Sequence, residues 1–234
     1  MVEQVPTAPK AILFDLDGTL VDSATDLAIA LKNTFLVMGL KPHSELKVRQ
    51  WIGNGVNKLI HRGLTNSMDG IAEETEFAKT REIFNEAYMN QIGEESELYP
   101  GVTAELENFK KAGIKTACIT NKDRNFTLQV LEKIEIKKYF DVVVCGDDLD
   151  NKKPSPEPLL FAAKKLSVSA VECLMIGDSK TDVKSANAAG IEIICVDYGY
   201  AQGENLKTLK IKAMISSFSE ISDCWEMNSY KNCG

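Results

Sequence analysis

The sequence predicts an α/β fold in which a doubly wound parallel sheet, a Rossmann-like core, carries an inserted all-helical domain. Short apolar runs alternate with segments of helical spacing over most of the 234 residues. One long interval near the start carries helical patterns alone. Repeated alternation of strand and helix is typical of a parallel sheet covered by helices. A chain of this length can hold one large or two modest domains.

Six apolar runs are the expected strands. They span Ala11 to Phe14, Lys115 to Ile119, Val142 to Cys145, Leu174 to Ile176, Glu192 to Val196 and Ala213 to Ile215. Four segments between them have helical spacing: Thr103 to Lys111, Phe126 to Lys133, Pro158 to Leu166 and Asp182 to Ala189. Gly190 follows the last of these segments and is expected to end its helix.

The first expected strand ends in two carboxylates, Asp15 and Asp17, on a glycine turn. The four apolar residues before them fit a strand that is buried on both faces of a parallel sheet. Ligands of such sheets collect outside the carboxyl ends of the strands. A polar turn alone would account for one aspartate, but not for two beside Gly18 and Thr19. Asp15 and Asp17 are therefore candidate catalytic residues.

The interval between the first strand and Pro100 predicts a second domain. Ser23 is the expected N-cap of a helix that runs to Gly39, with Leu27, Leu31 and Phe35 on one face. Phe84 and Tyr88 share the apolar face of a later helix. We expect residues 22–98 to form a helical domain and residues 1–21 and 99–234 to form the α/β core.

Composition excludes several classes of partner. The formal net charge is −7, so no general basic field is available to hold nucleic acid or an anionic membrane. No run approaches the ~18 to 20 apolar residues of a membrane span, and the first ten residues lack the apolar core of a signal peptide. The sequence has six cysteines, none of them in a C-x-x-C pair, and only two histidines. This composition favours buried thiols over a zinc site. We expect a cytoplasmic enzyme without nucleic-acid or membrane partners.

The D-x-D-G-T pattern from Asp15 to Thr19 resembles the nucleophile motif of phosphatases in the haloacid dehalogenase superfamily. Three later segments match the family's other motifs in the family's order. They are Thr120-Asn121-Lys122 at a strand end, Lys153-Pro154-Ser155-Pro156, and Gly177 to Asp182. Each motif is short, but four in the right order identify the chain as a member of this superfamily.

The resemblance implies a role for each catalytic candidate. Asp15 is expected to attack phosphorus and form an aspartyl-phosphate. Asp17 is expected to protonate the leaving oxygen and then to activate water. Thr120 would hold phosphoryl oxygens, and Lys153 would neutralise charge. The adjacent lysines at 152 and 153 would also fit a solvated, charged loop. The family motif places its lysine directly before a proline, which selects Lys153.

The resemblance also implies a magnesium ion as cofactor. Its expected ligands are an oxygen of Asp15, the backbone carbonyl of Asp17, and Asp178. Asp182 is expected either to bind the ion directly or to support the other ligands. An oxygen-rich site of this kind suits Mg²⁺, which keeps several waters and takes few protein carboxylates.

Two further segments resemble the bacterial phosphoglycolate phosphatases, and that resemblance extends over nearly the whole chain. They are Trp51 to Val56 and Tyr198-Gly199-Tyr200. The implied reaction is hydrolysis of 2-phosphoglycolate to glycolate and phosphate, a step of carbohydrate metabolism and glycolate biosynthesis. The helical domain would be a cap that hinges near Val21 to Asp22 and Leu98 to Gly101. The expected substrate-binding residues are Thr19, Asn121, Gly53, Asn54 and Gly55.

Other functions stay open at this point. A phosphosugar mutase, or a phosphatase of other small phosphomonoesters, would share Asp15 and Asp17. A dehalogenase would normally lack the second acid, and a non-catalytic phosphate-binding protein would have lost motif residues. The segment Gly53-Asn54-Gly55 has the alternative role of a tight connection between helices. The expected partner is a small phosphorylated metabolite, and the expected assembly is a monomer or a homodimer.

Overall fold

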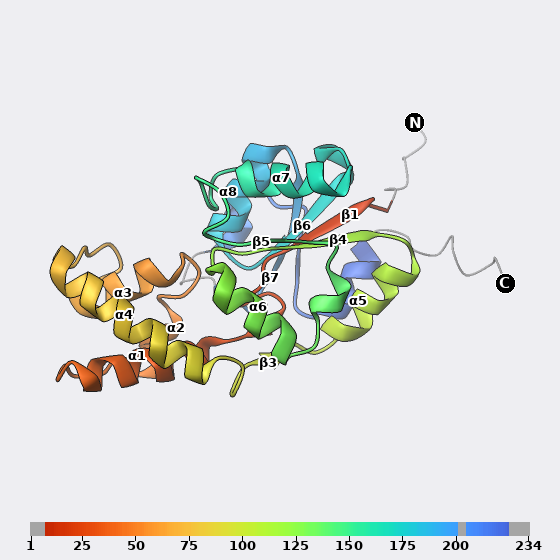
Figure 1. The fold of residues 1–234 in the computed structure, drawn as a ribbon. Helices are drawn as coiled ribbons and strands as arrows, with labels where there is room; N and C mark the ends of the chain where they lie inside the picture. The colour runs from red at the N-terminus through yellow and green to blue at the C-terminus, as the bar shows by residue number, and fades with distance from the viewer. Residues whose placement is uncertain (1–7, 201–204, 225–234) are drawn as a thin grey trace.

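The computed structural model describes residues 8–200 and 205–224. Its centre is a six-stranded parallel sheet with strand order β5-β4-β1-β6-β7-β8 (Figure 1). The strands are β1 (Ala11–Phe14), β4 (Lys115–Ile119), β5 (Val142–Val144), β6 (Cys173–Gly177), β7 (Glu192–Val196) and β8 (Ala213–Ile215). The predicted fold class, a doubly wound parallel sheet, is confirmed. All six predicted strands are present, and their ends differ from the prediction by at most one residue.

The register of β1 brings the ends of three strands level. Phe14 is opposite Cys118 of β4 on one side and Ile176 of β6 on the other. The chain runs from β1 toward β5 on one side and toward β8 on the other, so β1 lies at the switch point of the sheet. Polar residues that follow β1, β4 and β6 therefore meet at one edge, where ligands of such sheets bind.

Helices cover both faces of the sheet. They are α5 (Val102–Lys111), α6 (Arg124–Lys133), α7 (Glu157–Leu166) and α8 (Lys180–Ala189). Figure 1 shows α7 and α8 on one face and α5 and α6 on the other. Ile12 and Phe14 of β1 belong to the apolar core with α5 and α6, whereas Ala11 and Leu13 belong to the core with α7 and α8. All four side chains are fully buried, as expected for an apolar run in a parallel sheet.

Four helices lie between two short strands, β2 (Val21–Asp22) and β3 (Glu97–Leu98). They are α1 (Ala24–Val37), α2 (Glu45–Arg49), α3 (Val56–Thr65) and α4 (Glu74–Gln91). Val21 pairs with Leu98 and Asp22 with Glu97 in antiparallel fashion, so the chain enters and leaves this segment at one place. Figure 1 shows the four helices gathered at one side of the sheet. The predicted domain limits stay predictions, and the outer ranges include residues outside the described part.

The carboxylate of Asp26 joins α1 to the segment that returns from α4. This fully buried side chain accepts hydrogen bonds from Gln91 Nε2 at 2.9 Å, Gly93 N at 2.8 Å, Glu95 N at 3.0 Å and Ser96 Oγ at 2.5 Å. Two of these donors are backbone N–H groups of a turn that lies outside any strand, so no neighbouring strand supplies acceptors for them. Asp26 therefore fixes the position at which the helical segment returns to the sheet.

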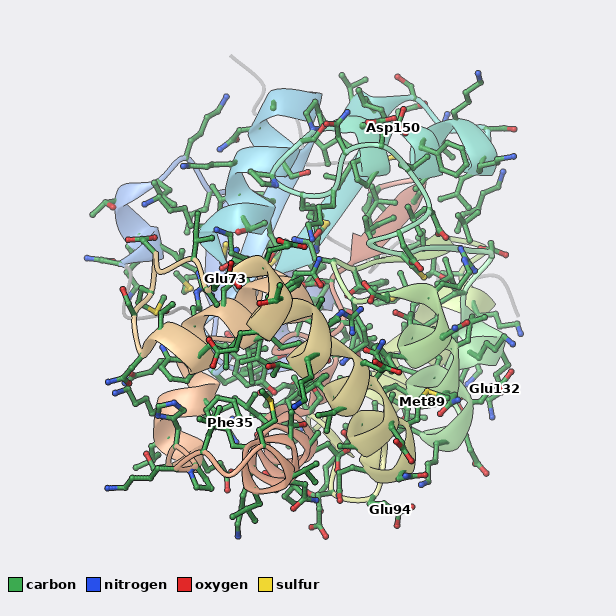
Figure 2. All side chains as sticks on the ribbon, turned by 60° about the vertical axis from the view of Figure 1, so that its left-hand side comes forward. Phe35, Glu73, Met89, Glu94, Glu132 and Asp150 are labelled. Atoms are coloured by element: carbon green, nitrogen blue, oxygen red, sulfur yellow. The ribbon has the colours of Figure 1, made fainter. Side chains whose placement is uncertain are left out.

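The end of α4 also contacts α6. Figure 2 shows Met89 and Glu94 on the side of the molecule where α6 carries Glu132. Lys133 Nζ of α6 donates to the carbonyl of Ile92 at 3.1 Å and pairs with Glu94. These contacts tie the inserted helices to the layer beneath the sheet.

Two expectations from composition can be compared with the structure. Four cysteines in or beside strands are free and buried, as predicted: Cys118, Cys145, Cys173 and Cys195. Within residues 8–200 and 205–224, no helix combines the length and the apolar character needed to cross a bilayer.

We expect Asp26→Ala to lower the free energy of unfolding by about 3 kcal/mol or more, because it leaves several buried donors without an acceptor. The measurement is urea unfolding followed by circular dichroism. Asp150 is exposed and supplies the control, because Asp150→Ala should change stability by less than about 0.5 kcal/mol. Equal stability of the two variants would contradict the structural role of Asp26.

Candidate active site

The carboxyl edge of the sheet collects most of the predicted site residues. Asp15, Thr120 and Asp178 directly follow β1, β4 and β6. Lys153 comes from the loop before α7, and Asp182 from the first turn of α8. All five residues are at most 7% exposed. The sequence motifs are therefore adjacent in space, as parallel strand ends require.

Lys153 bridges two of the carboxylates. Its Nζ lies 2.8 Å from Oδ1 of Asp15 and 2.7 Å from Oδ1 of Asp182. Burial disfavours the charged lysine, but the carboxylates of Asp15 and Asp182 outweigh that effect and raise the pKa of Lys153. The backbone N–H of Leu16 donates to the same oxygen of Asp15 at 2.8 Å. Asp15 is thus held in one orientation beside a fixed positive charge.

Asp178 is held from the other side of the site. Thr19 Oγ1 donates to its Oδ1 at 3.1 Å, and the backbone N–H of Tyr200 donates to its Oδ2 at 2.6 Å. Burial and the neighbouring Asp182 raise the pKa of Asp178 to about 7. Gly18 has φ +86°, and a Cβ there would lie 2.4 Å from Asp178 Oδ2. The glycine of the first motif therefore allows the turn to approach this carboxylate.

Asp182 also closes the first turn of α8. Its Oδ2 accepts from Ser179 N at 3.1 Å and from Ser179 Oγ at 2.5 Å, while Ser179 Oγ accepts from Asp182 N at 3.3 Å. This capping box satisfies two backbone donors that the helix leaves free. With Lys153 on its other oxygen, the Asp182 carboxylate has protein partners on both sides.

Three carboxylates form a group that could hold a metal ion. One oxygen each of Asp15, Asp178 and Asp182 lies within 4.8 Å of the others. Burial and the charge of Asp182 raise the pKa of Asp15 well above its ordinary value, in addition to the shift of Asp178. Three carboxylates here face one ammonium group, that of Lys153, so the group carries more negative than positive charge when it is ionised. An all-oxygen donor set with unbalanced charge fits a hard divalent cation.

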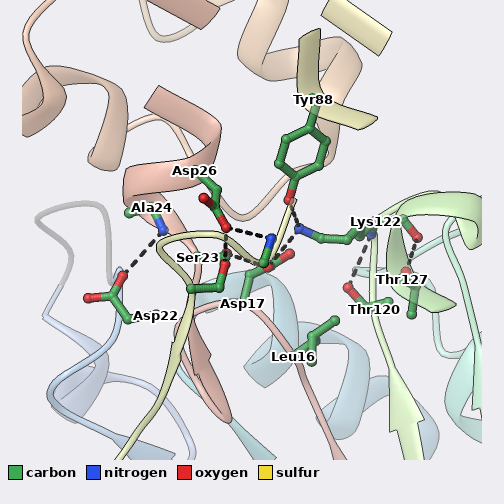
Figure 3. A network of polar contacts seen from close by, with 12 residues as sticks. Leu16, Asp17, Asp22, Ser23, Ala24, Asp26, Tyr88, Thr120, Lys122 and Thr127 are labelled. Atoms are coloured by element: carbon green, nitrogen blue, oxygen red, sulfur yellow. Dashed lines mark hydrogen bonds and ion pairs between the residues drawn. The ribbon is translucent and has the colours of Figure 1, made fainter. Parts of the chain in front are cut away.

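Asp17 lies in different surroundings from Asp15. Its Oδ1 accepts a hydrogen bond from Ser23 Oγ at 2.5 Å and pairs with Lys122 Nζ at 2.8 Å (Figure 3). Lys122 Nζ also donates to the phenolic oxygen of Tyr88 at 2.7 Å. Ser23 occupies the predicted N-cap position of α1, but its hydroxyl makes no capping bond and donates to Asp17 instead. The predicted N-cap position of Ser23 is confirmed, but its side chain serves Asp17 and not the helix.

A cavity of about 30 Å³ lies between the acids and the inserted helices. The sheet edge contributes Asp15, Asp17, Thr120, Asn121 and Lys122 to its wall, and the helical segment contributes Leu27, Ile52, Gly53, Gly55, Val56 and Leu59. One side of the cavity is thus charged or polar and the other side is mainly apolar. Such a division suits a small ligand whose reactive end faces the sheet.

The second motif frames the cavity from β4. Thr120 Oγ1 accepts from the backbone N–H of Lys122 at 3.1 Å. Asn121 Nδ2 donates to the carbonyl of Lys153 at 2.9 Å, which links the second and third motifs. Asn121 Oδ1 is buried without a hydrogen-bond partner in the described part of the chain.

The segment Gly53-Asn54-Gly55 touches the core. Gly53 and Gly55 line the cavity, whereas Asn54 Nδ2 donates to Thr181 Oγ1 at 3.0 Å and Asn54 Oδ1 accepts from Arg62 Nη2 at 2.9 Å. Asn54 thus joins α3 to α8. Thr19, the other predicted substrate-binding residue outside the cavity wall, is fully buried and faces Asp178.

Sequence reasoning gave no role to Lys122, Tyr88 or Tyr200. Lys122 follows β4 by three residues, so its position at a strand end was a usable signal. Tyr88 was assigned only to an apolar helix face. Tyr200 OH accepts from the backbone N–H groups of Ser23 and Ala24 at 2.8 and 3.0 Å, a contact that joins residues more than 170 positions apart.

The raised pKa of Asp178 predicts a pH-dependent stability in the presence of a chelator. Folding raises this pKa from 3.8 to about 7, so the contribution of Asp178 to stability is full below about pH 4 and is lost as pH rises toward 7. Wild type should therefore lose about 2 to 3 kcal/mol relative to Asp178→Asn between pH 5 and 8. Urea unfolding at both pH values measures this difference. The exposed Asp150→Asn is the control, and a constant difference for Asp178→Asn would contradict the shift.

Comparison with known proteins places this geometry in a family. The model of the haloacid dehalogenase-like hydrolases matches residues 12–196. A phosphoglycolate phosphatase of Nitrosococcus oceani is 42% identical over 215 residues, which cover 92% of this chain and 96% of that protein. A crystal structure from Haemophilus somnus, described as a predicted phosphoglycolate phosphatase, has a TM-score of 0.87 and 31% identity, over 93% of this chain and 98% of that one.

A structure of lower identity is a complex with phosphate. It is CbbY from Rhodobacter sphaeroides in complex with phosphate, with a TM-score of 0.76 and 25% identity, covering 91% of this chain and 96% of that one. Three findings agree: the family model matches residues 12–196, the Nitrosococcus protein is similar over most of its length, and the four motifs lie at one sheet edge. The chain belongs to the haloacid dehalogenase-like hydrolase family.

Proposed function

We propose that this protein is a Mg²⁺-dependent phosphatase that hydrolyses 2-phosphoglycolate to glycolate and phosphate. The observation that carries the proposal is the separation of two carboxylates from one motif. Asp15 lies against Lys153 and the acidic group, whereas Asp17 lies against Ser23 and Lys122. Environments that differ in this way allow two carboxyl groups to perform different tasks. Relatives of up to 42% identity are named phosphoglycolate phosphatase, which supports 2-phosphoglycolate as the substrate.

In the first step, an oxygen of Asp15 attacks phosphorus and the bond to the ester oxygen breaks. Asp17 gives its proton to that departing oxygen, so glycolate leaves as an alcohol. Lys153, 2.8 Å from the attacking carboxylate, reduces the repulsion between this carboxylate and the phosphate. Thr120 and the backbone N–H that follows it are the proposed donors to phosphoryl oxygens, with Asn121 beside them.

In the second step, water attacks phosphorus and the bond to Asp15 breaks. Asp17, now a carboxylate, takes the proton from that water. Phosphate leaves and Asp15 returns to its starting state. Hydrolysis of phosphate monoesters is among the slowest uncatalysed reactions, so positioning and charge neutralisation must act together.

The proposed ligands of Mg²⁺ are Asp15, Asp178 and the backbone carbonyl of Asp17, with Asp182 as a ligand or a support. The group of three carboxylates supports this assignment. Bound there, Mg²⁺ would supply positive charge to the phosphoryl oxygens as charge develops on them. The partners of Asp178 and Asp182 keep their carboxylates in place for that purpose.

Residues 22–98 are proposed to act as a cap over a core of residues 1–21 and 99–234, with hinges near Val21 to Asp22 and Leu98 to Gly101. Closure would exclude water from the reacting groups. A cytoplasmic location and a monomeric or homodimeric state stay predictions.

The purified protein should release phosphate from 2-phosphoglycolate only when Mg²⁺ or a similar hard cation is present. A panel that includes hexose phosphates and pyrophosphate, assayed for phosphate release, tests the substrate. A higher kcat/KM for a hexose phosphate would reject 2-phosphoglycolate as the substrate. Full activity in excess chelator would reject the metal-dependent mechanism.

Gly55 should be needed for closure. It has φ +85°, and a Cβ there would lie 3.1 Å from the backbone oxygen of Asn121. Gly39 has φ +69° with nothing within 4 Å, so it provides a matched control for backbone strain alone. Both Gly→Ala variants should lose about 1 kcal/mol of stability. Steady-state kinetics should show that Gly55→Ala alone loses kcat/KM, by roughly tenfold, and equal losses would mean that the contact with Asn121 is unimportant.

A further inference from the structure

Lys122 is a buried ammonium group to which the proposed reaction assigns no task. Its side chain is 3% exposed. Its Nζ lies 2.8 Å from Oδ1 of Asp17 and 2.7 Å from the hydroxyl oxygen of Tyr88, and 5.0 Å from the centre of the Tyr88 ring. A buried charge is costly unless it is paired and hydrogen-bonded. These two partners therefore determine where the ammonium lies.

The main chain of Lys122 is fixed to the core. Its N–H donates to Thr120 Oγ1 at 3.1 Å. Its carbonyl accepts from Gly146 N at 2.9 Å and from Thr127 Oγ1 at 3.2 Å. The side chain thus extends from a rigid point at the end of β4 toward the inserted helices, where Figure 3 shows it between Asp17 and Tyr88.

Tyr88 comes from the other side of the site, near the end of α4. It is fully buried, and its ring packs against Phe84 of α4 at 5.6 Å and Phe126 of α6 at 4.9 Å between ring centres. Burial raises the pKa of Tyr88 to about 12, so the phenol is neutral and its oxygen accepts the hydrogen bond from Lys122. The position of this oxygen depends on the docking of α4 against α6.

Asp17 receives both of its contacts on one oxygen, Oδ1, from Ser23 and Lys122. Ser23 lies directly after β2, at the entry to the inserted helices, and Lys122 contacts α4 near the exit. The carboxylate is therefore oriented by groups at both ends of the helical segment. None of the donors that orient Asp15 takes part.

We propose that Tyr88 is a positioning residue for Asp17 that acts through Lys122. When α4 is docked on α6, the phenol fixes the ammonium, and the ammonium fixes the Asp17 carboxylate toward the cavity. Proton transfer by Asp17 is then efficient only while the helices cover the site. The proposal rests on the proposed role of Asp17 in the phosphatase reaction.

The test is a double-mutant cycle on kcat with Tyr88→Phe and Lys122→Met. Tyr88→Phe keeps the ring and removes the oxygen, so kcat should fall about tenfold, the size expected for one hydrogen bond to a charged group, with KM changed less than twofold. In the Lys122→Met background, Tyr88→Phe should change kcat less than twofold. Lys122→Gln replaces Lys122→Met if circular dichroism shows that the latter does not fold.

Tyr139→Phe is the matched control. Tyr139 OH donates to Glu107 Oε1 at 3.0 Å near the amino end of β4, away from the site, so its loss should leave kcat unchanged. The proposal is overturned if Tyr88→Phe leaves kcat unchanged, if it acts on KM alone, or if it causes the same loss with and without Lys122.

Wild-type turnover is measured first on 2-phosphoglycolate and on 4-nitrophenyl phosphate. Activity on the second compound alone rejects the proposed substrate, and the cycle is then completed on 4-nitrophenyl phosphate. Activity on neither compound rejects the phosphatase function and the Tyr88 proposal with it. Activity on 2-phosphoglycolate without coupling between Tyr88 and Lys122 rejects the Tyr88 proposal alone.

Discussion

The structure depends on one electrostatic constraint, the crowding of three carboxylates around one ammonium at a buried sheet edge. Asp15, Asp178 and Asp182 are at most 7% exposed and bring oxygens within 4.8 Å of one another, while Lys153 pairs with two of them. Like charges at this spacing in a poorly hydrated site repel strongly. Local features hold the group together: backbone and hydroxyl donors on Asp178, a capping box on Asp182, and the close approach of Gly18. The remaining negative charge makes the edge suited to a cation, which would offset the repulsion between these carboxylates and an anionic phosphoryl group.

The second acid of the same motif depends on a different part of the fold. Asp17 is oriented by two side chains, Ser23 at the entry to the inserted helices and Lys122 at the end of β4. Lys122 in turn donates a hydrogen bond to Tyr88 of α4. The sheet therefore builds the surroundings of Asp15, and the helical segment completes those of Asp17. A division of this kind lets adjacent carboxylates keep separate roles, and it couples the second role to the position of the helices.

The sequence was sufficient to predict the sheet, because its four central strands are short apolar runs that are largely buried on both faces; β1 has the predicted limits Ala11–Phe14. The resemblance to the family implied that Asp15, Thr120 and Asp178 belong to one site, and the ends of three parallel strands bring them to one edge. Contacts between side chains that are far apart in the sequence could not be predicted from the sequence. Tyr88 and Lys122 are 34 positions apart, and a tyrosine on an apolar helix face gives no local sign that its hydroxyl meets an ammonium. Ser23 precedes a helix as a cap does, but a carboxylate within reach takes its hydroxyl instead.

The central claim is that Asp15 is the nucleophile and Asp17 transfers protons. The most direct measurement is mass spectrometry of Asp17→Asn, quenched during reaction with an activated phosphate ester. This variant keeps the attacking carboxylate and slows removal of the phosphoryl group, because the base that activates water is lost. The account predicts a phosphoryl group on Asp15, located by fragmentation of the peptide that contains β1. A phosphoryl group on any other residue, or continued hydrolysis by an Asp15→Asn variant, would contradict it.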